Sequence, residues 1–112
     1  MGEDLFVYGT LREDEVVRRV TGRTFPKAAG TLSGFRRVEG PAWFPYSNLD
    51  PQAGAFAEGM VLMGVDPASL ARLDAYEGAC YARRRVRVDT EGGPREAWVY
   101  VGLPEEIERM RR

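Results

Sequence analysis

The stretch FVYGTLRE, residues 6–13, is where an apolar run stops abruptly at a glycine. Residues 4–8 have the short apolar pattern of a β-strand, and Gly9 predicts the turn that ends it. Glycine also lets a ligand approach the backbone closely, because it carries no side chain. The stretch therefore predicts a first strand followed by a turn that could hold a ligand.

Thr10 and Glu13 have the spacing of a capping box, in which each side chain accepts a hydrogen bond from the backbone N–H of the other residue. We expect this box to begin a helix over about residues 11–20. The amides of Leu11 and Arg12 would then stay free at the positive end of the helix. Free amides in that position can hold a carboxylate or a phosphate.

The rest of the chain alternates between strand-like and helix-like segments. The expected elements are strand pieces around 28–38, a loop over 40–46, a turn at 51–54, a strand over 55–65, a helix from Asp66-Pro67 to Gly78, a hairpin of 83–89 with 96–101, and a helix over 104–112. Strands scattered between short helices favour an α+β fold with a small mixed β-barrel and helices packed around it. The length predicts a single domain over residues 1–112.

Charge and hydropathy exclude several kinds of partner. The net charge is −1 with a pI near 5.5, so no overall field favours nucleic acid or a membrane surface. No apolar run approaches the roughly 20 residues of a membrane helix, and the first residues do not resemble a signal peptide. Cys80 is the single cysteine, which fits a reducing compartment. We therefore expect a cytoplasmic protein whose partner is a small molecule.

The residue types that are missing also restrict the chemistry. The chain has no histidine, so Ser-His and Cys-His nucleophile pairs and histidine-ligated zinc are excluded within it. One cysteine cannot form a thiolate metal cluster. We expect no metal and no cofactor, and proton transfer must use carboxylate, Tyr, Lys or Cys. Asn48 and Gln52 are the only side-chain amides, which fits a hot habitat.

Glu77 is the strongest candidate for a catalytic group. Leu70, Leu73 and Glu77 have the i, i+3, i+7 spacing of one helical stripe, so the carboxylate points where the leucines point. An apolar environment and a position in the last helical turn both disfavour its charged form and raise its pKa, as a general base requires. The alternative is that Glu77 reaches solvent or pairs with an arginine among residues 83–85.

Several segments together resemble the γ-glutamylcyclotransferase-like family, which includes the γ-glutamylamine cyclotransferases. They are Tyr8-Gly9-Thr10-Leu11, Gly30-x-Leu32-x-Gly34-Phe35-Arg36-Arg37, the Pro45 loop, Gly59, Leu73-Asp74-Ala75-Tyr76-Glu77-Gly78, Tyr81-x-Arg83-Arg84-x-Val86 and Ala97-Trp98-Val99-Tyr100. The resemblance implies a compact mixed β-barrel and the release of 5-oxoproline from a γ-glutamyl amide, a carbon–nitrogen lyase or acyltransferase type of activity. It places the catalytic glutamate at Glu77, the substrate-cradling turn at residues 8–11 and a pocket tyrosine at Tyr100.

This chemistry agrees with the residues. The α-amine of a γ-glutamyl group attacks its own γ-carbonyl, so the protein mainly has to fold the substrate and move protons. Glu77 would take the proton of the amine and return it to the leaving amine. The α-carboxylate suits the turn amides, and the developing oxyanion suits a turn N–H or the Tyr100 hydroxyl.

Other side chains have two interpretations each. Tyr100 could be a core residue, and the aromatic residues Trp43, Phe44 and Tyr46 could wall the pocket or simply bury their own loop. We expect Arg83, Arg85 and Arg87 to form a solvated strand face, Arg84 to pair with Asp74 or Glu77, Asp74 to be a surface or hydrogen-bonding residue, and Cys80 to be a small buried residue.

Two other functions compete with an enzyme. A binding module could keep the pocket for a γ-glutamyl-like or amino-acid ligand without turnover. An RNA-binding domain could use the arginine strand and the aromatic loop, but the net charge of −1 argues against it. The sequence identifies neither the leaving amine nor an oligomeric state.

Overall fold

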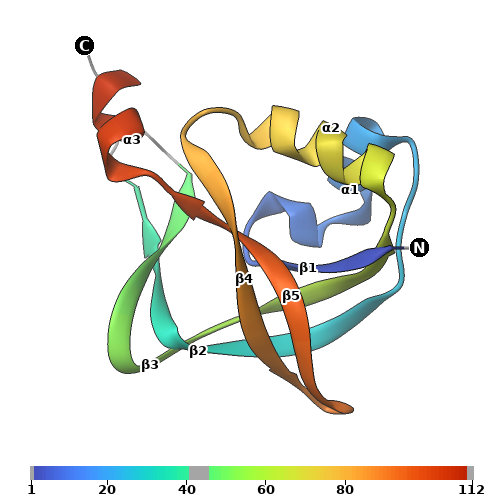
Figure 1. Cartoon of the computed structure of the whole chain (residues 1–112), viewed down its shortest axis with the longest axis horizontal. Helices are drawn as coiled ribbons and strands as arrows, with labels where there is room; N and C mark the ends of the chain where they lie inside the picture. Colours follow the sequence, from blue (N-terminus) through green and yellow to red (C-terminus); the bar gives the residue numbers. More distant parts are fainter. Residues whose placement is uncertain (1, 41–45, 111–112) are drawn as a thin grey trace.

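Five strands close into a barrel in the computed structural model, which describes residues 2–40 and 46–110 (Figure 1). The strands are β1 (Glu3–Val7), β2 (Lys27–Glu39), β3 (Ser47–Val65), β4 (Tyr81–Thr90) and β5 (Gly93–Gly102). The helices of these residues are the 3₁₀ helix η1 (Thr10–Arg12) and the α-helices α1 (Asp14–Thr21), α2 (Pro67–Glu77) and α3 (Pro104–Met110). The expected α+β fold with a mixed barrel and short helices is confirmed.

The barrel closes through its first and last strands. Its order is β1-β3-β2-β4-β5, and β5 returns to pair with β1 in parallel, at Leu5 with Trp98 and Phe6 with Val99. The other neighbouring strands are antiparallel. Helices α1 and α2 lie together beside β1, whereas α3 follows the end of β5 on the opposite side (Figure 1). Closure therefore brings the residues after β1 next to β5.

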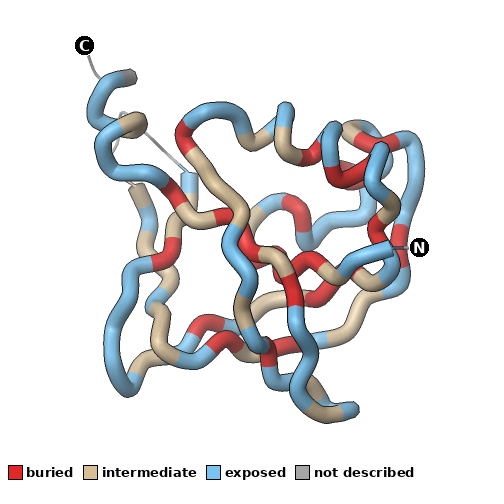
Figure 2. Tube along the Cα trace, viewed as in Figure 1, coloured by how far each residue is buried: buried red, intermediate tan, exposed pale blue. Residues whose placement is uncertain are grey.

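Buried side chains form two clusters separated by the barrel wall. On β5, Ala97 and Val99 pack on one side, whereas Trp98 and Tyr100 pack on the other, as strand alternation requires. Leu73 of α2 belongs to the same cluster as Tyr100. Buried residues lie along the second half of β1 and at intervals along the neighbouring β5 (Figure 2). Helix α2 is thus held by the same cluster that contains Tyr100.

A glycine allows β3 to lie unusually close to the end of β1. A Cβ atom built on Gly59 would collide with the backbone oxygen of Val7 and would lie 2.8 Å from the ring of Phe6. No side chain fits there without a shift of the backbone. Gly59 therefore sets the position of the last residue of β1, immediately before the glycine turn.

Helix α2 has the predicted ends. The carboxylate of Asp66 accepts a hydrogen bond from the Ser69 amide at 3.1 Å, Pro67 occupies the first turn, and Gly78 ends the helix with a positive φ of 76°. The expected helix between Asp66 and Gly78 is confirmed, and with it the place of Glu77 at the last helical position.

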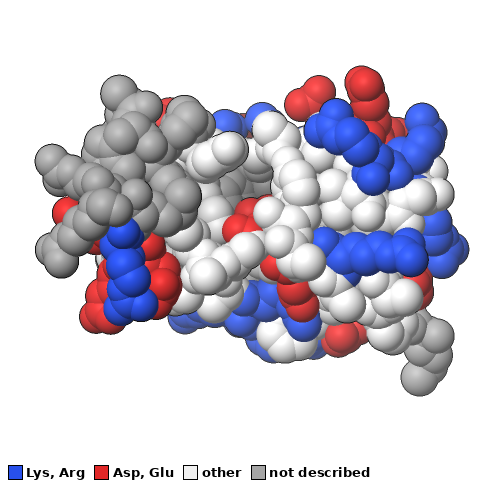
Figure 3. Space-filling view, turned by 90° about the horizontal axis from the view of Figure 1, so that it is seen from above, with Lys and Arg blue, Asp and Glu red and all other residues white. Residues whose placement is uncertain are grey.

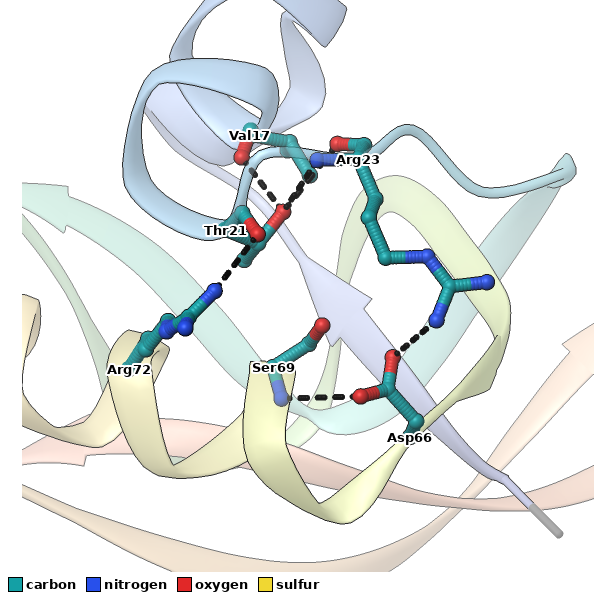
Figure 4. A network of polar contacts seen from close by, with 6 residues as sticks. All are labelled: Val17, Thr21, Arg23, Asp66, Ser69 and Arg72. Carbon is teal, nitrogen blue, oxygen red and sulfur yellow. Dashed lines mark hydrogen bonds and ion pairs between the residues drawn. The ribbon is translucent and has the colours of Figure 1, made fainter.

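A polar network fixes α2 against the end of α1 (Figure 4). The buried hydroxyl of Thr21 donates to the Val17 carbonyl at 2.8 Å and accepts from the amide of Arg23. Arg72 of α2 donates to the backbone oxygen of Thr21 at 3.0 Å, and Arg23 pairs with Asp66 at 2.9 Å. These contacts set the direction of the helix that carries Glu77.

The prediction of a capping box at Thr10 and Glu13 was wrong. No side-chain cap bond is made at η1 or at α1, and α1 begins at Asp14. The amide of Arg12 instead donates to the Gly9 carbonyl at 3.1 Å, and the amide of Glu13 to Thr10 at 3.0 Å. A tight 3₁₀ turn precedes the α-helix because these backbone bonds reach three residues back rather than four.

The prediction of a turn at residues 51–54 was also wrong. Strand β3 continues through this segment, since Phe35 pairs with Pro51 and Ser33 pairs with Phe56. The residues between those pairs bulge opposite Gly34. The predicted 83–89 and 96–101 hairpin is confirmed, and the last helix is α3, as described above. The predicted loop over 40–46 lies mostly outside the described residues.

Candidate functional site

A pocket of about 530 Å³ opens beside the turn that follows β1. Its volume lies in the range of small-molecule sites. Seen from above, the surface is hollowed near the middle between uncharged side chains, with acidic atoms visible there, and basic side chains gather toward the α1 and α2 side (Figure 3). All the site residues expected from the sequence line this pocket: Tyr8, Gly9, Thr10, Leu11, Glu77 and Tyr100.

Glu77 enters the pocket from the end of α2. Leu73 and Leu70, one and two turns earlier, are buried in the core, and Glu77 itself is half-buried. Burial raises the pKa of its carboxyl from 4.5 to about 7. No described residue donates a hydrogen bond to the carboxylate. The group is therefore poised to exchange a proton near neutral pH, as the leucine stripe predicted.

The turn after β1 offers backbone donors to the same pocket. The amides of Gly9, Thr10 and Leu11 donate to no acceptor in the described part of the chain. The prediction of a free amide is confirmed for Leu11, but that for Arg12 was wrong because its amide donates to Gly9. The pocket is thus lined both by residues with free backbone amides and by a carboxylate.

Three tyrosines of the pocket direct their hydroxyl protons into the protein. Tyr8 donates to the backbone oxygen of Tyr100 at 2.6 Å, and Tyr81 donates to the backbone oxygen of Ser47 at 3.0 Å. Tyr100 donates to a carboxylate oxygen of Asp74 at 2.7 Å. Burial, followed by the Tyr81 phenol and the negative charge of Glu77, raises the pKa of Tyr8 above its ordinary value. These phenols stay neutral at physiological pH.

Asp74 joins α2 to the β4–β5 hairpin. Arg83 donates to it through two nitrogens, at 2.7 and 3.1 Å, and Arg83 faces Tyr100 in the strand register. The expected pairing of Arg84 with Asp74 or Glu77 was therefore wrong, since Arg84 lies over the ring of Phe35. The expectation that Asp74 is a hydrogen-bonding residue is confirmed.

The face of β4 that we expected to be solvated is partly engaged in an ion pair and in contacts with an aromatic ring. Arg85 pairs with Glu3 at 3.2 Å, and the guanidinium groups of Arg83 and Arg85 lie 4.5 and 5.1 Å from the centre of the Trp98 ring. Arg87 is exposed, as expected. Arg83 and Arg85 therefore cover the Trp98 ring, and Arg85 is at the same time exposed to solvent.

The rim of the pocket contains residues that the sequence did not single out. Arg37 donates to the hydroxyl of Ser47 at 3.0 Å and pairs with Glu39 at 3.3 Å. Tyr81 lies at the start of β4, and the one available signal for it was its place in the resemblance, three residues after Gly78. The hydrogen bond of Arg37 with Ser47 joins β2 to β3, and local sequence patterns do not bring two strands together.

The remaining predicted residues divide into two groups. Cys80 is buried and lines the pocket, and Tyr46 lies on the rim with 60% of its surface exposed. Trp43 and Phe44 lie outside the described residues. In the described part, no group of three or more His, Cys, Asp or Glu residues could hold a metal ion. Within the same residues, no helix has the length and apolar character needed to cross a bilayer.

The chain is a closed mixed barrel whose pocket is lined by a glycine turn and a half-buried glutamate. The family model described as "Gamma-glutamyl cyclotransferase, AIG2-like" matches residues 5–112, so the chain belongs to that family. The family-level resemblance is confirmed.

Individual relatives agree with this assignment. AIG2-like protein C of Arabidopsis thaliana is 37% identical over 87 residues, which cover 76% of this chain and 49% of the relative. AIG2-like protein A of the same plant is 34% identical over 88 residues, covering 79% and 53%. The chain spans about half the length of these curated relatives.

Solved structures share the fold. A solution structure of an Arabidopsis thaliana protein superposes with a TM-score of 0.83 at 28% identity, covering 97% of this chain and 82% of that one. A structure titled gamma-glutamyl cyclotransferase has a TM-score of 0.81 at 18% identity, covering 92% and 68%. The second likeness supports the barrel architecture.

Proposed function

We propose that this chain is a cyclotransferase that releases 5-oxoproline and a free amine from a γ-glutamyl amide, with Glu77 as general acid and base. The observation that carries the proposal is the half-buried carboxylate of Glu77, which has a pKa of about 7 and lies in one pocket with the unpaired amides of the turn. A base with a pKa near the working pH is the most effective proton carrier.

The reaction forms one bond and breaks one bond. The substrate's α-ammonium gives a proton to Glu77, and its nitrogen then attacks the γ-carbonyl carbon. Because the nucleophile and the carbonyl belong to the same molecule, correct folding of the substrate supplies much of the rate. Glu77 passes this proton to the leaving nitrogen as the C–N bond breaks. The ring nitrogen still has one proton more than the lactam, and Glu77 carries this second proton to the free amine, so the products are the neutral lactam and the protonated amine. One carboxylate thus serves both proton transfers.

The turn amides have two tasks in this proposal. The α-carboxylate of the substrate accepts hydrogen bonds from backbone N–H groups between Gly9 and Leu11, and another N–H there stabilises the oxyanion that forms on the γ-carbonyl. The hydroxyl of Tyr100 was the alternative donor for the oxyanion, but its proton is directed to Asp74. The backbone donors are therefore the better candidates.

A substrate screen tests the proposal. The protein is incubated with γ-glutamyl amides of alkylamines, polyamines and amino acids, and 5-oxoproline is measured by chromatography with mass detection. We expect turnover of at least one amide and a fall of roughly 10²–10⁴-fold in its rate for Glu77→Gln. Full activity of Glu77→Gln would remove Glu77 from this role.

A matched control separates chemistry from changes in pocket charge. Glu13 lines the same pocket and is exposed, so Glu13→Gln removes an equal charge without removing the half-buried carboxylate. We expect it to keep most of the activity. If the wild-type protein binds γ-glutamyl amides but forms no 5-oxoproline from any of them, the chain is a binding module instead.

A further inference from the structure

The carbonyl oxygen of Gly9 accepts two hydrogen bonds from one residue. The backbone amide of Arg12 donates to it at 3.1 Å, and Nε of the same arginine donates to it at 3.0 Å. A carbonyl oxygen has two lone pairs, so these two bonds use its whole capacity as an acceptor. Backbone and side chain of Arg12 therefore hold the peptide group between Gly9 and Thr10 together.

This peptide group carries one of the donors of the turn. Because the peptide is planar and trans, the N–H of Thr10 points in the direction opposite to the carbonyl of Gly9. Thr10 lines the pocket, and its amide has no acceptor in the described part of the chain. A bond from a guanidinium is stronger than one from a neutral donor and polarises the peptide that accepts it. The Arg12 side chain thus acts on both the direction and the strength of the Thr10 donor.

Glycine at position 9 makes such an anchor necessary. A peptide group that follows glycine rotates at little cost, because glycine has no Cβ to restrict it. A rotation would put the Gly9 carbonyl where the Thr10 N–H had been. The anchor is itself held from β2, since Lys27 donates from Nζ to the Arg12 carbonyl at 3.0 Å and pairs with Asp14 at 3.0 Å. The turn is therefore fastened to the barrel at Arg12.

We propose that Arg12 is a positioning residue for the cyclotransferase reaction. Its Nε–H fixes the peptide between Gly9 and Thr10, so that the Thr10 amide is ready to donate to an oxygen of the substrate. A donor that is already oriented needs no rearrangement at the moment of reaction. The inference rests on the proposed function, since that function supplies the substrate oxygen.

A direct contact with the substrate is the competing role for this side chain. Arg12 is exposed and lines the pocket, so its positive charge could instead attract an anionic group of the ligand. The two roles use different parts of the arginine. Positioning requires an N–H at the place of Nε, whereas direct attraction requires the charge.

Three substitutions of Arg12 separate the donor from the charge. The side-chain nitrogen of glutamine is as many bonds from Cα as Nε of arginine, so Arg12→Gln keeps the donor and removes the charge. Arg12→Lys keeps the charge but has carbon at that place, and Arg12→Met has neither donor nor charge. We expect kcat/KM for 5-oxoproline release to fall at least about tenfold in Arg12→Met and Arg12→Lys, and less than about threefold in Arg12→Gln. Arg19→Met, at an exposed position of α1, removes the same charge and should leave the rate unchanged.

The backbone amides report on the turn in the absence of substrate. We expect sharp amide resonances for Thr10 and Leu11 in the NMR spectrum of the wild type and of Arg12→Gln. In Arg12→Met the peptide is free to rotate, so relaxation dispersion should show exchange at these two amides. Sharp resonances without exchange in Arg12→Met, or higher activity in Arg12→Lys than in Arg12→Gln, would overturn the proposal.

The proposed function and the anchor fail in different ways. Exchange at the Thr10 amide in Arg12→Met, with no 5-oxoproline from any amide substrate, would keep the anchor and reject the enzyme. Wild-type rates of 5-oxoproline release in all three variants would keep the enzyme and reject Arg12 as a positioning residue.

Discussion

Tyr100 donates its hydroxyl proton to Asp74 at 2.7 Å, and Asp74 lies one helical turn before Glu77 on α2. The bond ties the last strand of the barrel to the helix that carries the candidate base. It also fixes the direction of the hydroxyl group. Its proton points toward Asp74, and only the lone pairs of the oxygen are left for other partners. We therefore expect the pKa of Glu77 to depend on Asp74 through the hydroxyl of Tyr100.

Removal of Asp74 should change the pH dependence of the enzyme. In Asp74→Ala, the Tyr100 hydroxyl is free to donate to Glu77, and Arg83 loses its partner, so the pKa of Glu77 falls. We expect the acidic limb of kcat/KM to move to lower pH by about one unit. Asp74→Asn keeps an acceptor for Tyr100 and should move the limb less. An unchanged limb in Asp74→Ala would contradict the role given to this bond.

The wild-type pH profile follows from the raised pKa of Glu77. The carboxylate must be ionised to take a proton, so kcat/KM should fall as the pH drops through about 7. A bound ammonium favours the charged carboxylate, so the corresponding limb of kcat should lie at lower pH. Both profiles come from initial rates between pH 5 and 9. A kcat/KM that is constant down to about pH 5 would be incompatible with Glu77 as the base.

The same carboxylate should lower the stability of the protein above neutral pH. Its folded pKa of about 7 lies above the unfolded value of 4.5, so the unfolded state loses this proton first as the pH rises. The contribution of Glu77 to stability is full below pH 4.5 and is lost by about pH 7. At pH 8 we expect Glu77→Gln to exceed the wild type by roughly 1–3 kcal/mol in urea unfolding, a range reduced for partial solvent exposure. The difference should vanish near pH 4, and Glu13→Gln should show none at either pH.

Thr21 should contribute to stability through its hydroxyl rather than its size. Thr21→Val keeps the volume but removes the bond to the Val17 carbonyl and the acceptor for the Arg23 amide. We expect a loss of about 1–3 kcal/mol in the free energy of unfolding, because buried backbone groups are left unsatisfied. Thr24→Val, at an exposed position three residues later, should change stability little. Equal effects of the two variants would show that the network is not responsible.

Gly59 should tolerate no side chain. Gly59→Ala places a methyl group against the Val7 carbonyl and the Phe6 ring, so we expect a loss of at least about 1–3 kcal/mol from overpacking. Gly92→Ala is the control, since the nearest atom to its added Cβ is the Thr90 hydroxyl at 3.9 Å. Thermal unfolding of both variants measures the difference. An unaffected Gly59→Ala would mean that β1 and β3 can separate without cost.

Local chemistry predicted those parts of the fold that local bonds determine. The ends of α2 followed from Asp66, Pro67 and Gly78, because cap bonds and a positive φ involve only neighbouring residues. The position of Glu77 in the pocket followed from the spacing of two leucines. The capping box failed because Thr10 and Glu13 also fit a 3₁₀ turn, and the sequence does not distinguish the two.

Features that depend on strand pairing could not be predicted from the local sequence in the same way. Residues 51–54 have turn chemistry, yet β2 pairs with β3 on both sides of them and makes the segment a bulge. Arg83, rather than Arg84, reaches Asp74 because the register places it opposite Tyr100. The hydrogen bond from the Tyr8 hydroxyl to the backbone oxygen of Tyr100 joins residues 92 positions apart. Such bonds follow from barrel closure and leave no local pattern.

The parallel contact of β1 with β5 has a consequence for biosynthesis. Strand β1 is synthesised before β5, and one edge of β1 has no partner until Trp98 and Val99 of β5 are available. Until then, the glycine turn has no Tyr100 beside it and the phenol of Tyr8 has no carbonyl to meet. A nascent chain therefore cannot complete this pocket before β5 has been synthesised.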